Sequence, residues 1–216
     1  MKAILIPVKT FSESKKRLAA HYSPTERAGL AAALCEDFFR IVSGLTGIDA
    51  VFVASKEPRA LAWAKAHGWE TIVEDEQISE SHSVDGASCV CAGRGVRALL
   101  RLPIDIPLTI AADIRTVFDA IQDAPSCVLI PSRDGTGTNA LLRSPPTLFP
   151  SHFGPNSLAL HLNEAERCGA RVKVLRNPNI ELDIDEIDDL RALGGRVRAD
   201  SATARWLARN FLSPVG

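Results

Sequence analysis

The sequence lacks the glycine-rich motifs that most often hold nucleotide phosphates. Neither G-x-x-x-x-G-K-[ST] nor G-x-G-x-x-G occurs in its 216 residues, which excludes a P-loop and a dinucleotide-binding fingerprint. A G-x-S-x-G elbow is also missing, and the five histidines are not clustered with serine or cysteine in a local motif. The sequence therefore gives no sign of a nucleophilic triad, and His152 is of interest only because it lies beside a loop suited to a binding pocket.

Long apolar runs and an excess of either charge are missing as well. The apolar stretch at the N-terminus meets Pro7 and Lys9 after a few residues, too early for a signal peptide or for a membrane span of roughly 20 apolar residues. The formal net charge is -1, which provides no general attraction to nucleic acid or to an anionic membrane. We therefore expect a cytoplasmic protein that binds neither.

The five cysteines do not form a recognisable framework. Their number is odd and they are scattered through apolar segments, whereas secreted disulfide-rich domains have regular spacings. Cys89 and Cys91 form a C-x-C pair, but no second pair or histidine cluster completes a zinc site. We interpret all five as reduced thiols without a metal.

The chain alternates between short strands and helices. Apolar and β-branched runs predict strands at 3–8, 50–54, 71–73, 108–111, 127–131, 171–175 and 180–184. Helical spacing and capping signals predict helices at 24–43, 58–67, 86–100, 113–120, 157–168 and 186–193. This alternation, without a repeat or a linker, indicates a single α/β domain over 1–216 with a mainly parallel sheet, in which ligands bind beyond the carboxyl ends of the strands.

The final segment, 201–216, is predicted to be a helical tail. Apolar side chains recur at helical spacing through SATARWLARNFL, with Ser201 as a suitable N-cap. We expect this tail to pack on the body of the domain or on a second subunit, so a homodimer is a reasonable expectation.

Three aspartates have the arrangement expected of a metal site. Asp183 and Asp185 lie two apart in a strand-like segment, which places both side chains on one face. Asp105 lies among apolar residues and prolines in LPIDIPL, where an isolated charge is costly unless it is paired or bound to a metal. Such oxygen ligands suit Mg²⁺. The alternative is that Asp185 caps the following helix and the other two lie in solvent.

Two small-residue loops and one basic loop are candidates for binding phosphate. DGTGTNAL (134–141) offers backbone N–H groups and threonine hydroxyls, and FGPNS (153–157) offers a glycine and a serine at a helix start. An ordinary turn and a plain helix cap are the alternatives for these two. The stretch from Lys9 to Arg17 supplies cations where a triphosphate would lie, although a solvated loop would have the same composition.

Taken together, these motifs resemble the phospholactate guanylyltransferase family. They are IPVK with SKKRL, SPTERAGLAAAL, LPIDIPL, RDGTGTNALL with SPP, FGPNS, and LDID with DDL, and they span about Ile6 to Leu190. The resemblance implies a Rossmann-like nucleotidyltransferase fold with a mainly parallel, mixed sheet flanked by helices. It also implies an enzyme of coenzyme F-420 biosynthesis that moves GMP from GTP to the phosphate of 2-phospho-L-lactate, phosphoenolpyruvate or 3-phospho-D-glycerate and releases pyrophosphate.

The same resemblance implies a role for each candidate residue. It assigns the metal, two Mg²⁺ ions, to Asp105, Asp183 and Asp185, the substrate phosphate to Thr138, Gly154 and Ser157, and the GTP phosphates to the catalytic cations Lys9, Lys15 and Arg17. Asp85 stands in SVDGA where the family usually has the amide of G-L-N-x-A, so we expect its carboxylate near the N–H groups of guanine.

Two other functions remain open from the sequence. One is a related nucleotidyltransferase that uses another nucleotide, or a sugar-phosphate or cofactor acceptor. The other is a non-catalytic paralogue that binds a nucleotide or a partner, which SVDGA in the middle motif favours.

Overall fold

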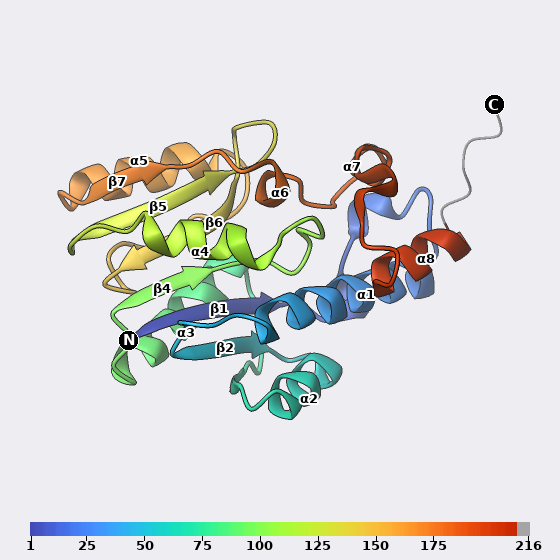
Figure 1. Ribbon diagram of the computed structural model, residues 1–216, viewed down its shortest axis with the longest axis horizontal. Coiled ribbons are helices and arrows are strands. Elements are labelled where there is room, and N and C mark those ends of the chain that lie inside the picture. Colours follow the sequence, from blue (N-terminus) through green and yellow to red (C-terminus); the bar gives the residue numbers. More distant parts are fainter. Residues whose placement is uncertain (211–216) are drawn as a thin grey trace.

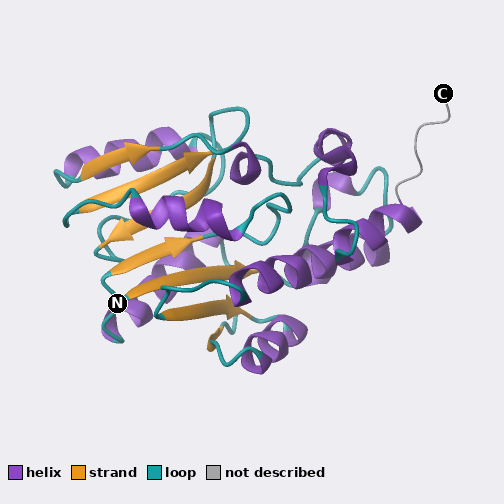
Figure 2. Cartoon of the chain, in the orientation of Figure 1, coloured by secondary structure: helices purple, strands orange, loops and turns teal. Residues whose placement is uncertain are grey.

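A seven-stranded sheet forms the centre of the computed structural model, which describes residues 1–210 (Figures 1 and 2). Its strands lie in the order β3-β2-β1-β4-β6-β5-β7, and neighbours are parallel except that β6 is antiparallel to both β4 and β5. The strand bounds are β1 Lys2–Val8, β2 Ala50–Ser55, β3 Glu70–Val73, β4 Ala98–Arg101, β5 Ser126–Pro131, β6 Thr138–Ser144 and β7 Arg171–Val174.

Helices cover both faces of this sheet. α1, α2 and α4 contribute to the largest buried cluster on one face, whereas α3 and α5 pack on the other (Figure 1). The α-helix bounds are α1 Pro24–Ser43, α2 Pro58–Ala66, α3 Glu80–Gly93, α4 Ala111–Asp119, α5 Ser157–Arg167, α6 Pro178–Glu181, α7 Ile187–Leu193 and α8 Ala202–Asn210. Short 3-10 turns lie at η1 Phe11–Glu13, η2 Lys16–Leu18 and η3 Gly194–Arg196. Across residues 1–210, no helix combines the length and the apolarity needed to cross a bilayer.

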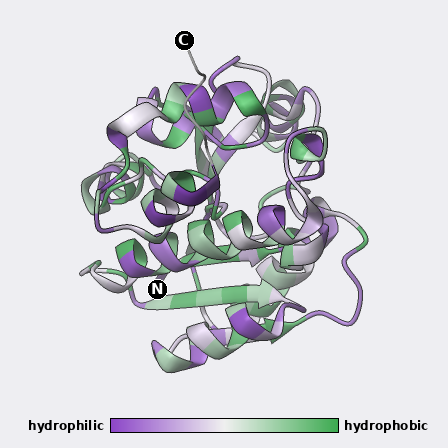
Figure 3. Cartoon of the chain, turned by 90° about the vertical axis from the view of Figure 1, so that its right-hand side faces the viewer, coloured by the Kyte–Doolittle hydropathy of each residue, from purple (hydrophilic) through white to green (hydrophobic). Residues whose placement is uncertain are grey.

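Strand β1 shows why the central strands are apolar throughout. Ile4 and Ile6 join the cluster under α1, α2 and α4, whereas Ala3 and Leu5 join the cluster under α3. All four are fully buried because successive side chains point to opposite faces and helices cover both. Figure 3 shows a mostly green, hydrophobic strand in the sheet, while the helices around it carry both hydrophilic and hydrophobic residues.

The predicted start of α1 and the packing of the C-terminal helix are confirmed. Ser23 and Glu26 form the capping box, with Pro24 in the first turn. α8 packs on α1: its buried Trp206 donates from Nε1 to Glu26 O at 3.0 Å, and Asp37 of α1 accepts the first backbone N–H groups of α8. The helical tail therefore packs on the body of the domain, while the remainder of the predicted tail, 211–216, lies outside the described residues.

Three predicted elements are wrong. The helix predicted at 86–100 is two elements, because α3 ends at Gly93 and Gly95, with a φ of 85°, turns the chain into β4. The segment 108–111 leads into α4 and forms no strand. The strand predicted at 180–184 begins instead as the short helix α6, since Asn177 caps it through its side chain and Pro178 occupies the first turn.

Two strands, β4 and β6, were not predicted. β6 begins at Thr138, inside the segment interpreted as a phosphate loop, and pairs with β4 and β5 along its length. It is buried at nearly every position and so has no alternation of apolar and polar residues. Its insertion between β4 and β5 brings the turn before it to the same edge of the sheet as the loops after β1 and β4.

Candidate active site

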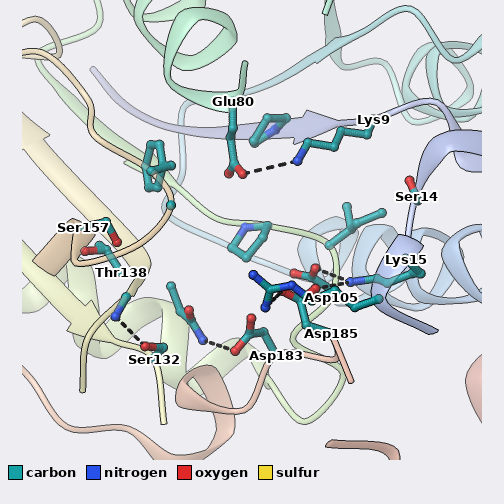
Figure 4. A pocket seen from close by; sticks show the side chains of 18 of the residues that line it. Lys9, Ser14, Lys15, Glu80, Asp105, Ser132, Thr138, Ser157, Asp183 and Asp185 are labelled. Carbon is teal, nitrogen blue, oxygen red and sulfur yellow. Dashed lines mark hydrogen bonds and ion pairs between the residues drawn. The ribbon is translucent and has the colours of Figure 1, made fainter. Parts of the chain in front are cut away.

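A cleft of about 990 Å³ opens at the carboxyl ends of the parallel strands. Its walls come from distant parts of the sequence, namely the turns after β1 and β4, the β5–β6 turn, the residues before α5, and the loop between α6 and α7. Figure 4 shows its two chemically distinct sides, with Lys15, Asp105 and Asp185 on one and Thr138 and Ser157 on the other. The cleft therefore lies at the edge of the sheet where the sequence predicted ligand binding.

The ammonium group of Lys15 lies between two carboxylates. Its Nζ is 2.5 Å from Asp105 Oδ2 and 3.3 Å from Asp185 Oδ1, and 6% of the Lys15 side chain is exposed. Burial lowers the pKa of Lys15, but the two carboxylates outweigh burial and raise it. Burial also raises the pKa of Asp105, yet Lys15 and then Arg101 outweigh it and the pKa is lowered. Lys15 is thus a charged, fixed group and not part of a solvated loop.

Asp183 is held on the floor of the same region by Asn139. Its Oδ1 accepts Nδ2–H of Asn139 at 3.1 Å, and the same amide donates to the carbonyls of Ile180 and Glu181 at 2.9 and 3.0 Å. Burial, together with the charges of Asp105 and Asp185, raises the pKa of Asp183 to about 6. The three carboxylates are therefore close enough to affect one another's charge.

The strand predicted to carry Asp183 and Asp185 is absent, although both side chains line the cleft. The two residues lie in an extended loop between α6 and α7 and not on a strand. The capping alternative is also wrong, because Glu186 is the N-cap of α7 and Asp189 accepts the backbone N–H groups of Asp185 and Glu186.

The donor set fits a hard cation in its chemistry. Carboxylate oxygens are the ligands that Mg²⁺ prefers, and a cation, the ammonium of Lys15, already stands between Asp105 and Asp185. Within residues 1–210, no group of three or more His, Cys, Asp and Glu side chains is arranged to hold a metal ion. Binding of one metal by all three aspartates therefore requires movement of side chains from the positions described.

Two further cations lie at the rim. Arg17 Nη1 is 3.5 Å from Asp185 Oδ2, and Lys9 Nζ is 3.9 Å from Glu80 Oε2. The two side chains are 66% and 62% exposed. Exposed pairs of this kind contribute little to stability, so both cations are accessible to an anionic ligand in the cleft.

The β5–β6 turn does not form the nest of free N–H groups that its composition predicted. Asp134 accepts the backbone N–H of Thr136 at 3.0 Å and its hydroxyl at 2.8 Å, while Gly137 N–H donates to Ser132 Oγ at 2.7 Å. Hydrogen bonds from Ser132 and Thr136 lower the pKa of Asp134 to about 2. The turn is thus closed on itself and carries a fixed negative charge, which repels a phosphate.

Thr138, Gly154 and Ser157 are brought together beside this turn. Thr138 begins β6 and Ser157 begins α5, and Figure 4 shows their hydroxyls next to one another. A Cβ built on Gly137 would lie 3.9 Å from Ser157 Oγ, which confirms how closely the turn approaches the helix. The φ of Gly154 is 125°, a conformation that favours glycine. Two hydroxyls and the positive end of α5 therefore face one region of the cleft.

Sequence reasoning missed Arg101 and Asn139, which connect the two sides. Arg101 ends β4, donates from Nη1 to Asn139 O at 2.9 Å and is ion-paired with Glu80. Its guanidinium lies 4.1 Å from the centroid of the Phe153 ring, and burial lowers its pKa to about 10. A charged residue at the end of the apolar run ALLR is the available signal, but the helical spacing predicts a helix through most of that run.

Comparison with known proteins identifies the family. The sequence profile of the family described as "Guanylyl transferase CofC like" matches residues 1–201. The chain belongs to this family. Its relatives include the phosphoenolpyruvate guanylyltransferase of Rubrobacter xylanophilus, 35% identical over 191 residues (88% of this chain and 91% of that protein). The 2-phospho-L-lactate guanylyltransferase of Methanothermobacter thermautotrophicus is 32% identical over 188 residues (86% and 81%).

Solved structures of other nucleotidyltransferases share the fold of this CofC-like chain. A protein of Desulfovibrio desulfuricans G20 described as a nucleotide-diphospho-sugar transferase aligns with a TM-score of 0.76 over 98% of this chain and 96% of that one, at 17% identity. A cytidylyltransferase from Leptospira borgpetersenii aligns with a TM-score of 0.59 over 97% and 95%, at 14% identity. These likenesses establish the Rossmann-like nucleotidyltransferase fold.

The position of Asp85 does not support the expectation that its carboxylate lies near guanine. Asp85 lies on α3 but is not among the residues that line the cleft, whereas Glu80 and Ser83 of the same helix are. Its two carboxylate oxygens accept the backbone N–H of Ser151 at 3.1 and 3.0 Å, and Oδ1 is 3.4 Å from Arg143 Nη1. His152, the histidine expected near a pocket, does not line the cleft either.

Proposed function

We propose that this chain is a cytoplasmic guanylyltransferase that moves GMP from GTP to the phosphate of a three-carbon phosphoacid in coenzyme F-420 biosynthesis, with release of pyrophosphate. Membership of the CofC-like family and the names of its relatives support GTP as the donor and phosphoenolpyruvate or 2-phospho-L-lactate as the acceptor. 3-Phospho-D-glycerate is the third candidate, because it carries the same two anionic groups on three carbons.

The single observation that supports this assignment best is the division of the cleft. One side holds three carboxylates with Lys15, and the other holds two hydroxyls at the start of α5. A reaction between two phosphate-bearing substrates needs such a division, because one side must neutralise the triphosphate and the other must orient an anionic acceptor.

The chemistry requires positioning more than acid–base catalysis. An acceptor phosphate oxygen attacks the α-phosphorus of GTP, a new P–O bond forms, and the bond between the α-phosphorus and the bridging oxygen breaks, so that pyrophosphate leaves with the electron pair. The attacking oxygen is already anionic at neutral pH, so no proton has to be removed. The absence of a histidine dyad from the lining of the cleft, within residues 1–210, agrees with this requirement.

The residues would divide the work as follows. Thr138, Gly154 and Ser157 hold the acceptor by hydrogen bonds, and Lys9, Lys15 and Arg17 neutralise the phosphates of GTP. Asp105, Asp183 and Asp185 would hold Mg²⁺, which when bound supplies charge neutralisation to the substrate phosphates. Lys15 would then exchange its pairing with Asp105 for pairing with a phosphate. The homodimer expected from the sequence stays a prediction.

The test is a matrix of nucleotides and acceptors. Purified protein with Mg²⁺ is mixed with GTP, ATP, CTP or UTP and with each of the three acids, and both pyrophosphate and the mass of the product are measured. We expect pyrophosphate only with GTP, and a product whose mass is that of the acceptor plus GMP less water. Turnover with CTP or UTP and none with GTP would indicate a related transferase. Binding of a nucleotide without pyrophosphate under saturating conditions would indicate a non-catalytic paralogue.

A matched variant pair tests the assignment of the two sides. Ser157→Ala should raise the KM for the acceptor by about 10-fold or more, the range expected for one hydrogen bond to a charged group, and leave the KM for GTP unchanged. Ser151→Ala, which changes a buried serine near α5 that does not line the cleft, is the control and should change neither constant.

A further inference from the structure

His161 is a buried histidine with both ring nitrogens hydrogen-bonded, and it does not itself line the cleft. It lies on α5 with no exposed surface. Its Nδ1 is 3.0 Å from Thr138 Oγ1, and its Nε2 accepts the backbone N–H of His152 at 2.9 Å. The imidazole therefore bridges the strand that carries Thr138 and the loop that carries Gly154.

The partners of the ring fix the position of its proton. A backbone N–H can only donate, so Nε2 must accept and cannot carry hydrogen. Burial, with the charges of Arg143 and Arg101 and the neighbouring ring of His152, lowers the pKa of His161 to about 3, which keeps the ring neutral. A neutral ring with a bare Nε2 carries its proton on Nδ1. Nδ1–H is therefore the donor, and Thr138 Oγ1 is the acceptor.

The direction of that hydrogen bond decides whether the Thr138 hydroxyl acts as a donor or an acceptor toward a ligand in the cleft. A threonine hydroxyl has one proton, and its oxygen already accepts from His161. The hydroxyl proton must therefore point away from the ring, and Thr138 lines the cleft. A hydroxyl fixed in this way is a permanent donor, which suits an anionic ligand and opposes a ligand that offers only N–H or O–H groups.

We propose that His161 is a positioning residue that fixes the hydroxyl of Thr138 as a hydrogen-bond donor to the anionic group of the acceptor. The proposal rests on the proposed function in that it takes the ligand of this side of the cleft to be a phosphoacid. The surroundings favour this role over simple packing, because the rings of Phe153 and Phe149 lie at 5.1 and 6.1 Å from the imidazole and exclude other polar partners. The bond from Nε2 to His152 also fixes the start of the FGPNS loop.

Two substitutions of His161 test the roles of its two ring nitrogens separately. In His161→Gln, a side-chain oxygen can reach the place of Nε2 and accept the backbone N–H of His152, but nothing replaces the Nδ1 donor. In His161→Asn, the amide can take the place of Nδ1 and donate to Thr138. The first variant should raise the KM for the acceptor by about 10-fold, equivalent to one hydrogen bond to a charged group, and the second should keep it within about twofold. The KM for GTP should not change in either.

Thr138→Val provides the background that isolates the effect. Without the hydroxyl, His161→Gln should raise the acceptor KM no further, because the group through which His161 acts is gone. An unchanged acceptor KM in His161→Gln, or an equal rise in the presence and absence of the Thr138 hydroxyl, would overturn the proposal. If His161→Gln does not fold, an acceptor KM in His161→Asn as high as that in Thr138→Val would overturn it equally.

A readout without catalysis keeps the two proposals apart. If the wild-type protein releases no pyrophosphate with any acceptor, the proposed function fails. Nitrogen-15 NMR of the folded protein then tests the inference about His161. We expect a proton on Nδ1 and none on Nε2, and with phosphoenolpyruvate added as the probe we expect the shift of the Thr138 resonances to need an about 10-fold higher concentration in His161→Gln than in the wild type. The opposite tautomer would refute the inference whatever the enzyme's activity.

Discussion

Replacing Lys15 with methionine tests the electrostatic centre of the cleft. Methionine keeps the length and apolar contacts of the lysine stem and the same Cβ in the left-handed conformation, where φ is 56°. It removes only the cation that lies 2.5 Å from Asp105 Oδ2 and 3.3 Å from Asp185 Oδ1. We therefore expect Lys15→Met to lower the free energy of unfolding, because Asp105 loses its main partner while 22% of its side chain is exposed.

The size of this loss follows from the burial of the pair. Removing one partner of a buried ion pair costs about 3–5 kcal/mol, and Asp105 retains the nearby charge of Arg101 and some contact with solvent. We therefore expect the lower end, about 3 kcal/mol, which for a chain of this size corresponds to a decrease in Tm of about 6–12 °C. Lys16→Met changes the exposed neighbouring lysine and should cost less than about 0.5 kcal/mol.

The pH dependence of the difference has a definite sign. The pKa of Asp105 is lowered in the native state, so its contribution is present above its unfolded pKa of about 3.9 and is lost as pH falls through the native value. The pKa of Lys15 is raised, so its contribution is complete below its unfolded pKa of about 10.4 and is lost as pH rises through the native value. In wild type, the stability that the pair contributes should therefore be constant from about pH 5 to 9 and shrink outside that window.

Urea denaturation and thermal unfolding, with and without Mg²⁺, measure these effects. If the ammonium group of Lys15 occupies the place that Mg²⁺ would take between the carboxylates, Mg²⁺ should raise the Tm of Lys15→Met more than that of the wild type. The variant has the same carboxylates and no competing ammonium. Equal losses in Lys15→Met and Lys16→Met would refute the argument from burial. An equal Mg²⁺ response in Lys15→Met and wild type would refute the idea that ammonium and metal compete for one place.

Three further outcomes are expected. Asp183→Asn should lower kcat/KM by more than about 100-fold in steady-state assays, because metal affinity depends on each ligand, and near-normal activity at low Mg²⁺ would exclude the metal role. Gly137→Ala should cost about 1–3 kcal/mol in urea denaturation, because a Cβ would lie 2.7 Å from Ser132 Oγ, and an unchanged midpoint would show that the turn can relax. Between pH 6.5 and about 3, His161 binds a proton in the unfolded chain but not in the native protein, so this residue lowers the free energy of unfolding of the wild type by about 1.4 kcal/mol for each pH unit of acidification. His161→Gln should lack this loss, which acid titrations of unfolding would measure.

Elements with strong local signals were predicted from the sequence, and elements defined by their neighbours were not. α1 is fixed by Ser23, Pro24 and Glu26, whose capping interactions are local and present in the structure. β4 and β6 are defined by pairing with other strands, and because both are buried on both faces they lack the alternation that identifies a strand. The seven-stranded sheet could therefore be predicted as a class, but its order could not.

The candidate site shows the same division between residue identity and environment. All three aspartates were found from their residue type and their neighbours, and all three line the cleft. What the sequence could not provide was the conformation that joins them, since Asp183 and Asp185 share a side of an extended loop held by Asn139 and Asp189. For the turn at 132–137 the composition was misleading. It suits a phosphate nest, but the backbone N–H groups of Thr136 and Gly137 donate to Asp134 and Ser132.

The unusual aspartate in SVDGA is explained by packing on the far side of α3. Arg143 of β6 is buried, and besides Asp85 it contacts the carbonyl of Phe149 and Ser88 Oγ, at 2.8 Å for the latter. A buried guanidinium needs a counter-charge, and Asp85 provides one while its oxygens also accept the N–H of Ser151. An amide at position 85 would leave Arg143 without a carboxylate. Asp85 therefore anchors the loop that leads to Gly154, and the cationic rim of the cleft is the place where the nucleotide phosphates are expected.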